Sequence, residues 1–203
     1  AKEYKYAKRV DIIPNYINNV KSHVEDYSVK KAIAVGRLEY QKGFDILIDC
    51  WKEIAKRYPD WKLDIYGEGS CREELQRQIN SLQLVDKVKL CGKNNNIIDI
   101  YPLYSLHLMT SRYEGLPMTL IEAQACGLSS VVFDYQYGAS DIVSNGHNGL
   151  IIEQGNSKLF IEAAMKIMSS KELRKEYGTN AISISKQYYR ENIINKWIQI
   201  INN

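Results

Sequence analysis

The sequence predicts an α/β fold built on a doubly wound parallel sheet with helices on both faces. Short apolar runs alternate with helical patterns along the 203 residues, and this alternation is typical of parallel sheets assembled from β-loop-α units. The length suits one α/β domain, and a hydrophobic content of 45% supports a packed core.

Composition and charge exclude several classes of protein. The formal net charge is only +3 and the charges are scattered, so we expect no nucleic-acid partner. No apolar run has the roughly 18 residues of a transmembrane helix, so we expect at most peripheral membrane association. The cysteines lack C-x-x-C spacing, which predicts free, mostly buried thiols in a reducing cytoplasm and no metal site. They are Cys50, Cys71, Cys91 and Cys126.

The first 28 residues are polar and aromatic without a clear period, and we interpret 1–28 as a hinge or linker segment. Within it, the apolar pair Ile12-Ile13 precedes Pro14-Asn15, a pattern that predicts a short strand entering a turn. We expect the folded domain over 29–190 and a separate C-terminal helix over 191–203.

The first β-loop-α unit carries two cations in its loop. Residues 31–36 form an apolar run that ends in Gly36, and a helix with one apolar face is predicted over 44–58. Ligands of open α/β sheets bind beyond the carboxyl ends of the strands. We therefore expect Arg37 and Lys42, which lie in the connecting loop, to point into a cleft.

The second unit joins a strand over 61–67 to a charged helix over 71–82. Gly67 and Gly69 stand at the junction, and we interpret them as a tight turn that lets the backbone approach a ligand. His107 falls in a later strand, where a packed histidine is expected. The other elements are predicted as strands over 88–92, 106–111, 129–133 and 150–152, and as helices over 98–103, 158–168, 173–188 and 191–201.

The stretch 111–126 carries the strongest signal for a site. Pro117 suits the first position of a helix, because its φ is already helical and its missing N–H needs no partner there. The unpaired backbone N–H groups of the first turn and the positive end of the helix would then form an anion site. These N–H groups belong to Met118, Thr119 and Leu120.

Two carboxylates bracket this anion site. Glu114 precedes the turn through Gly115, Leu116 and Pro117, and Glu122 follows on the helix. A carboxylate can accept two hydrogen bonds from a vicinal diol. The pair therefore suits a ligand with a diphosphate in the middle and hydroxyl groups at both ends, which is the layout of a nucleotide-sugar.

These motifs resemble those of a known family. The residues from Glu114 to Glu122 are similar to the E-x7-E motif of the GT-B retaining glycosyltransferases, specifically glycosyltransferase family 4 (group 1). The loop 36–43 is similar to the G-R-L-x-x-x-K-G element of the same family. The resemblance covers nearly the whole chain, and it implies the Rossmann-like C-terminal half of a GT-B fold, which binds the nucleotide-sugar donor.

The resemblance also implies roles for single residues. Arg37 and Lys42 would stabilise the diphosphate leaving group, Glu114 would hold the sugar hydroxyls, and Glu122 would hold the ribose diol. Lys93 would meet the nucleobase. No metal ion or other cofactor is expected.

The resemblance implies that Gly67 and Gly69 line the donor cleft. It also implies that a glycan or lipid-linked acceptor binds the N-terminal half of the enzyme, which we expect this chain to lack. The isolated chain would then bind a donor, expected to be a UDP-sugar of a bacterial polysaccharide pathway, and transfer nothing. The full enzyme would work in the cytoplasm. An alternative location is the inner face of the cell membrane.

Other interpretations stay open at this stage. A sugar phosphorylase or a nucleotide-sugar epimerase could use the same architecture, and release of sugar-1-phosphate would identify a phosphorylase. A nucleotide-sugar binding module without catalysis is a third alternative. A glycosidase fits less well, because its two carboxylates must flank a scissile bond, whereas Glu114 and Glu122 flank the start of a helix.

Overall fold

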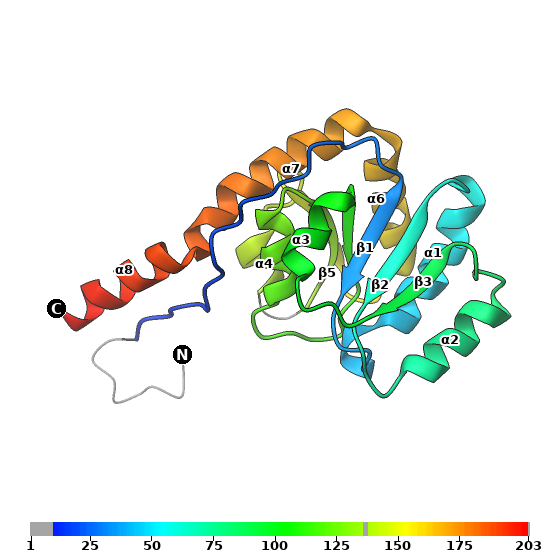
Figure 1. The fold of residues 1–203 in the computed structure, drawn as a ribbon, viewed down its shortest axis with the longest axis horizontal. Coiled ribbons are helices and arrows are strands. Elements are labelled where there is room, and N and C mark those ends of the chain that lie inside the picture. Colours follow the sequence, from blue (N-terminus) through cyan, green and yellow to red (C-terminus); the bar gives the residue numbers. More distant parts are fainter. Residues whose placement is uncertain (1–9, 136–137, 203) are drawn as a thin grey trace.

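The computed structural model describes residues 10–135 and 138–202. Its strands form one parallel, six-stranded sheet in the order β3-β2-β1-β4-β5-β6, with helices on both faces (Figure 1). This confirms the predicted α/β class. The strands are β1 (Lys31–Val35), β2 (Lys62–Tyr66), β3 (Val88–Gly92), β4 (Leu106–Met109), β5 (Ser129–Asp134) and β6 (Gly149–Glu153).

Burial of the sheet on both faces explains why its strands appear as apolar runs in the sequence. Ala32 and Ala34 of β1 belong to one core cluster, while Ile33 between them belongs to another on the opposite face. The first face is covered by α1 (Phe44–Arg57), α2 (Arg72–Ser81) and α6 (Ser157–Ser169). The other is covered by α3 (Ile97–Ile100), η3 (Tyr101–Leu103), α4 (Met118–Ala125) and α5 (Ala139–Ile142).

Strand order places the site. The chain moves outward from β1 to β2 and β3, and then returns to the other side of β1 with β4. The loops that follow β1 and β4 therefore leave the sheet in opposite directions, and ligands of such folds bind in the crevice between them. The loop after β1 contains η2 (Tyr40–Lys42).

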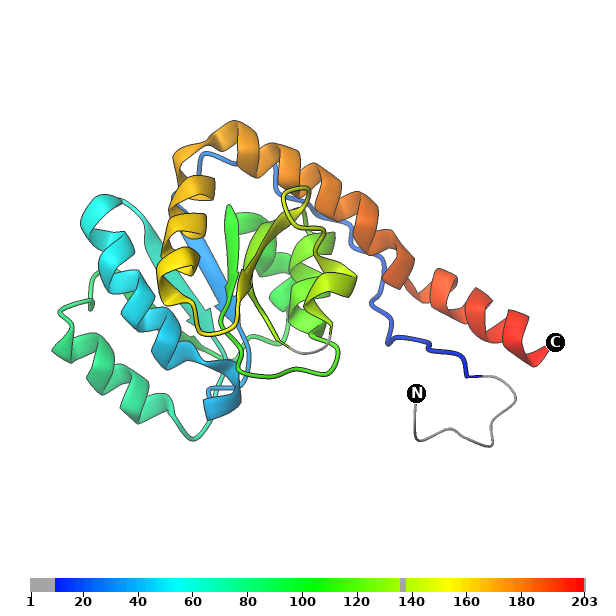
Figure 2. The ribbon, with the colours of Figure 1, turned by 180° about the vertical axis from the view of Figure 1, so that it is seen from behind.

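The C-terminal helices lie partly outside the compact domain. In place of one helix over 173–188, the structure has α7 (Lys171–Ser185) followed by the 3₁₀ turn η4 (Lys186–Tyr188), and α8 (Arg190–Ile201) corresponds to the helix predicted over 191–201. Figure 2 shows α8 extending away from the sheet. None of the described helices is both long and apolar enough to cross a membrane.

The predicted strand around Ile12 is wrong. Among residues 10–16 no strand is formed, and Ile12 is 91% exposed. The segment lies apart from the sheet, on the side of η4 and α8 (Figures 1 and 2), where no strand offers it hydrogen bonds. It is tied down farther along, where Ile17 donates to the Tyr188 oxygen at 2.9 Å and accepts from the Arg190 N–H at 3.0 Å.

The loops after β1 and β2 pack backbone against backbone. A Cβ at Gly67, whose φ is +149°, would lie 1.8 Å from the Gly36 oxygen, and one at Gly69 would lie 2.4 Å from the Leu38 oxygen. The Leu38 N–H donates to the Glu68 oxygen at 2.9 Å. The close approach that these glycines permit is therefore to the neighbouring loop, which carries Arg37.

Gly67→Ala should lower the free energy of unfolding by about 3 kcal/mol, because the new Cβ collides with the backbone and the φ suits only glycine. Gly155→Ala is the matched control: its φ is +78°, but no described atom lies within 4 Å of the added Cβ. We expect that control to lose about 1 kcal/mol. Urea unfolding measures both values, and equal losses would contradict the packing argument.

Candidate functional site

An ion pair between Lys42 and Glu114 joins the loops that follow β1 and β4. Lys42 Nζ lies 2.6 Å from Glu114 Oε1, and the two side chains are only 13% and 7% exposed. Ser111 Oγ donates to the same oxygen at 2.8 Å, and Gln41 Nε2 lies 3.4 Å from Oε2. The structure thus brings two predicted residues into direct contact and adds two supporting residues that the sequence did not reveal.

Helix α4 begins one residue later than predicted. Pro117 is the N-cap, with φ −77° and ψ 91°, and Met118 is the first helical residue. The extended ψ turns the Pro117 carbonyl into the helix, where it accepts the Leu120 N–H at 3.0 Å. The prediction of a free N–H at Leu120 is therefore wrong. The N–H groups of Met118 and Thr119 have no hydrogen-bond partner among the described residues, so two donors remain for the predicted anion site.

Glu122 lies inside α4 against a buried tyrosine. Tyr101 Oη donates to the Thr119 oxygen at 3.1 Å and lies 3.5 Å from Glu122 Oε2. Burial raises the pKa of Glu122, and the hydrogen bond from Tyr101 opposes this only in part. Tyr101 is fully buried. Its apolar surroundings in the sequence gave no sign that it supports a site residue.

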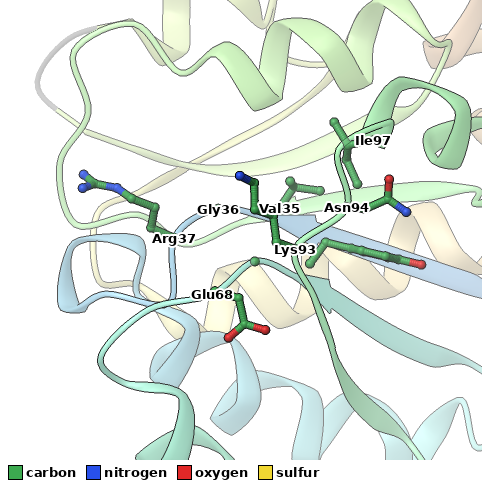
Figure 3. Close-up of a pocket in the computed structure, with 9 residues that line it drawn as sticks. Val35, Gly36, Arg37, Glu68, Lys93, Asn94 and Ile97 are labelled. Atoms are coloured by element: carbon green, nitrogen blue, oxygen red, sulfur yellow. The ribbon is translucent and has the colours of Figure 1, made fainter.

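A cavity of about 310 Å³ opens beside the loop after β1 and collects several predicted residues. Gly36, Arg37, Gly67 and Lys93 all line it. Figure 3 shows Arg37 extending away from the wall that Asn94 and Ile97 form, so its guanidinium lies at one end of the cavity. Gly69 packs on Leu38 and is not among the lining residues.

The turn between the two carboxylates lines a second cavity, of about 530 Å³. Gly115 and Leu116 form one side of it, and the segment from Ile12 to Asn15 forms another. No described atom lies within 4 Å of a Cβ built at Gly115. The loop that carries Glu114 is therefore open toward the cavity that it shares with residues 12–15.

His107 is a packed side chain, as predicted. Its ring is buried, Nδ1 lies 3.3 Å from Ser130 Oγ, and the Tyr101 ring meets it edge-on at 6.4 Å between centroids. Burial, assisted by the charge of Lys42, lowers the pKa of His107 to about 3. The imidazole is therefore neutral at physiological pH.

The described residues contain no group of three or more His, Cys, Asp or Glu side chains that could hold a metal ion. All four cysteines are free, but burial matches the prediction only for Cys50 and Cys126. Cys71 and Cys91 are partly exposed.

A model of the family described as glycosyl transferases group 1 matches residues 16–184. The chain belongs to this family. The amylovoran biosynthesis glycosyltransferase AmsD of Erwinia amylovora is 34% identical over 195 residues, which cover 95% of this chain and 54% of AmsD. The chain spans about half or less of the length of the curated relatives that it matches.

Two solved structures have the same fold. A mutant of S. aureus TarM, crystallised with fondaparinux, alpha-GlcNAc-glycerol and UDP, superposes with a TM-score of 0.92 at 26% identity, over 100% of this chain and 41% of TarM. The pneumococcal O-GlcNAc transferase GtfA in complex with UDP and GlcNAc gives a TM-score of 0.85 at 26% identity, over 98% of this chain and 41% of GtfA.

Glu122→Gln should stabilise the chain at pH 7 by about 1 kcal/mol, because it removes a carboxylate that burial destabilises. The folded state binds the Glu122 proton more tightly than the unfolded state, since its pKa is raised. Stability from this group is thus present at low pH and is lost as the pH rises from the ordinary to the raised pKa. Urea unfolding should show a higher free energy of unfolding for Glu122→Gln than for the unmodified chain at pH 7, but not at pH 4. An equal gain in stability at both pH values would contradict this account.

Proposed function

We propose that this chain is the donor-binding domain of a retaining glycosyltransferase. The full enzyme would move a hexose from a nucleoside-diphosphate sugar, with UDP as the nucleotide, to a glycan or glycolipid acceptor. The main support for this proposal is the Lys42–Glu114 ion pair together with the free N–H groups in the first turn of α4. The presence of UDP in the TarM and GtfA complexes supports the choice of nucleotide.

The positive groups at the crevice would stabilise the diphosphate as it leaves. A lysine ammonium has three N–H donors, and Glu114 accepts only one from Lys42, so the others can reach phosphate oxygens. Arg37 is exposed at the cavity and adds a guanidinium, which suits bidentate binding of phosphate. The N–H groups of Met118 and Thr119 complete the anion site at the positive end of the helix.

The carboxylates would bind the two ends of the donor. Glu122 would accept hydrogen bonds from the ribose diol, and the cavity lined by Lys93 and Gly67 would hold the base. Glu114 would hold the sugar hydroxyls. Because Glu114 also contacts Lys42, its removal should affect the diphosphate as well as the sugar, so the two roles are not separable in this residue.

Catalysis would then consist of charge stabilisation and positioning. We propose that the acceptor attacks the anomeric carbon from the face that the diphosphate leaves, so that its configuration is retained. The cations and helix N–H groups would neutralise the leaving group without a metal ion.

The acceptor site is proposed to lie in residues outside this chain, across the cavity lined by Gly115 and Leu116. On this basis the isolated chain binds the donor weakly and transfers no sugar. Its free cysteines fit a reducing compartment, so we propose a cytoplasmic location, at the inner face of the membrane where the acceptor is lipid-linked.

Lys42→Met tests the proposal. We expect the affinity of the chain for UDP to fall about tenfold and that for UMP to change less than twofold, because a lost charge contact to the second phosphate costs about 1.4 kcal/mol. Calorimetric titration in EDTA measures both constants. Lys56→Met is the control, since Lys56 pairs with Glu53 on the exposed side of α1. Unchanged UDP affinity in Lys42→Met, or binding that requires a metal ion, would contradict the proposal.

A further inference from the structure

We propose that Arg112 and Asp45 form a clamp that holds the Lys42 loop and the Glu114 loop at their working distance. Arg112 would thus be a positioning residue that acts through Lys42 and Glu114. The inference rests on the proposed function, in which Lys42 and Glu114 are among the residues that bind the donor.

The clamp begins with a two-pronged ion pair. Arg112 Nη1 donates to Asp45 Oδ1 at 2.9 Å, and Nη2 donates to Oδ2 at 2.6 Å. This fork geometry gives stronger and more directional hydrogen bonds than a single contact. Burial by itself would raise the pKa of Asp45, but the hydrogen bonds and charge of Arg112 outweigh that effect and lower it.

Arg112 also holds the loop after β1 directly. Its Nη1 donates to the Tyr40 oxygen at 2.6 Å, and its guanidinium carbon lies 3.9 Å from the centre of the Tyr40 ring. The Arg112 backbone N–H donates to the Gln41 oxygen at 2.8 Å, and Gln41 Nε2 returns a bond to the Tyr113 oxygen at 2.9 Å. These contacts involve the residues next to Lys42 and next to Glu114.

The loop needs such a clamp because the core does not anchor it. The 3₁₀ turn η2, which ends in Lys42, contains no buried residue. One end of the turn is fixed where Thr110 Oγ1 donates to the Gly43 oxygen at 2.8 Å. The contacts of Arg112 with Tyr40 and Gln41 fix the other end, so that Lys42 is held from both sides.

The charges of the clamp favour positioning over ligand binding. The Asp45 carboxylate compensates the guanidinium of Arg112, whose side chain is 19% exposed. A phosphate would have to displace that carboxylate to reach it. Arg37, in contrast, is exposed at the cavity. Arg112 therefore contributes the placement of Lys42 and leaves the phosphate contacts to Lys42 and Arg37.

Three variants of the 203-residue chain test the clamp by titration with UDP and with UMP. Arg112→Gln should lower the UDP affinity about tenfold and change the UMP affinity less than twofold, like removal of Lys42 itself. Arg112→Lys should recover part of the loss, because a lysine keeps one of the bonds to Asp45. The control is Lys56→Gln. It breaks the Lys56–Glu53 ion pair, which lies on α1 like Asp45 but does not connect two loops, so both affinities should stay unchanged.

Two outcomes would overturn the clamp. If Arg112 has only a structural role, the UDP affinity, the UMP affinity and the thermal midpoint of unfolding should all fall in Arg112→Gln. If Arg112 has no role, Arg112→Gln should bind UDP like the unmodified chain.

A readout without ligand separates this inference from the proposed function. If the unmodified chain binds neither UDP, GDP nor ADP, the proposed function fails. The clamp is then judged from the Lys42 ammonium signal in NMR spectra of ¹⁵N-lysine-labelled chain, assigned by its loss in Lys42→Met. The signal should be protected in the unmodified chain and in Lys56→Gln, and lost in Arg112→Gln. Its persistence in Arg112→Gln would refute the clamp.

Discussion

The ion pair of Lys42 with Glu114 is the interaction on which the candidate site depends. The strand order sends the loops after β1 and β4 in opposite directions, and a crevice is the geometric result. The 2.6 Å contact spans that crevice and places a cation and a carboxylate side by side with little exposure to water. Low exposure strengthens electrostatic interactions, so this pair holds the two loops together and, in the proposed function, would also bind a charged ligand.

Around this pair, several features lower the stability of the folded chain, and a domain with a purely structural role would avoid them. Glu122 is a partly buried carboxylate with a raised pKa, and the hydroxyl of Tyr101 lies 3.5 Å from it. The first N–H groups of α4 are left without a partner among the described residues. Gly67 adopts a backbone conformation that suits only glycine, so that neighbouring loops can meet. Such features gather where a ligand completes the interactions.

The sequence predicted the fold well because strands buried on both faces give continuous apolar runs, as in β1. It assigned Lys42 and Glu114 to the site because their loops carry family motifs; the structure places the two side chains in contact, and their role in binding stays a prediction. It failed at Ile12, where an apolar pair lies in an exposed segment apart from the sheet, and at Leu120, whose N–H is bonded through an unexpected ψ at Pro117. Arg112 was not predicted because its partner, Asp45, is 67 positions away in the sequence.

The most direct test of the account is a titration of the ¹⁵N-labelled chain with UDP in EDTA, followed by two-dimensional NMR. A donor site at the crevice predicts that the backbone signals of Gly36, Lys93, Met118 and Thr119 shift together and saturate at one common affinity. Shifts confined to other parts of the chain, or shifts that appear only after a divalent metal ion is added, would contradict the central claim that the α4 end and its two loops form a metal-independent diphosphate site.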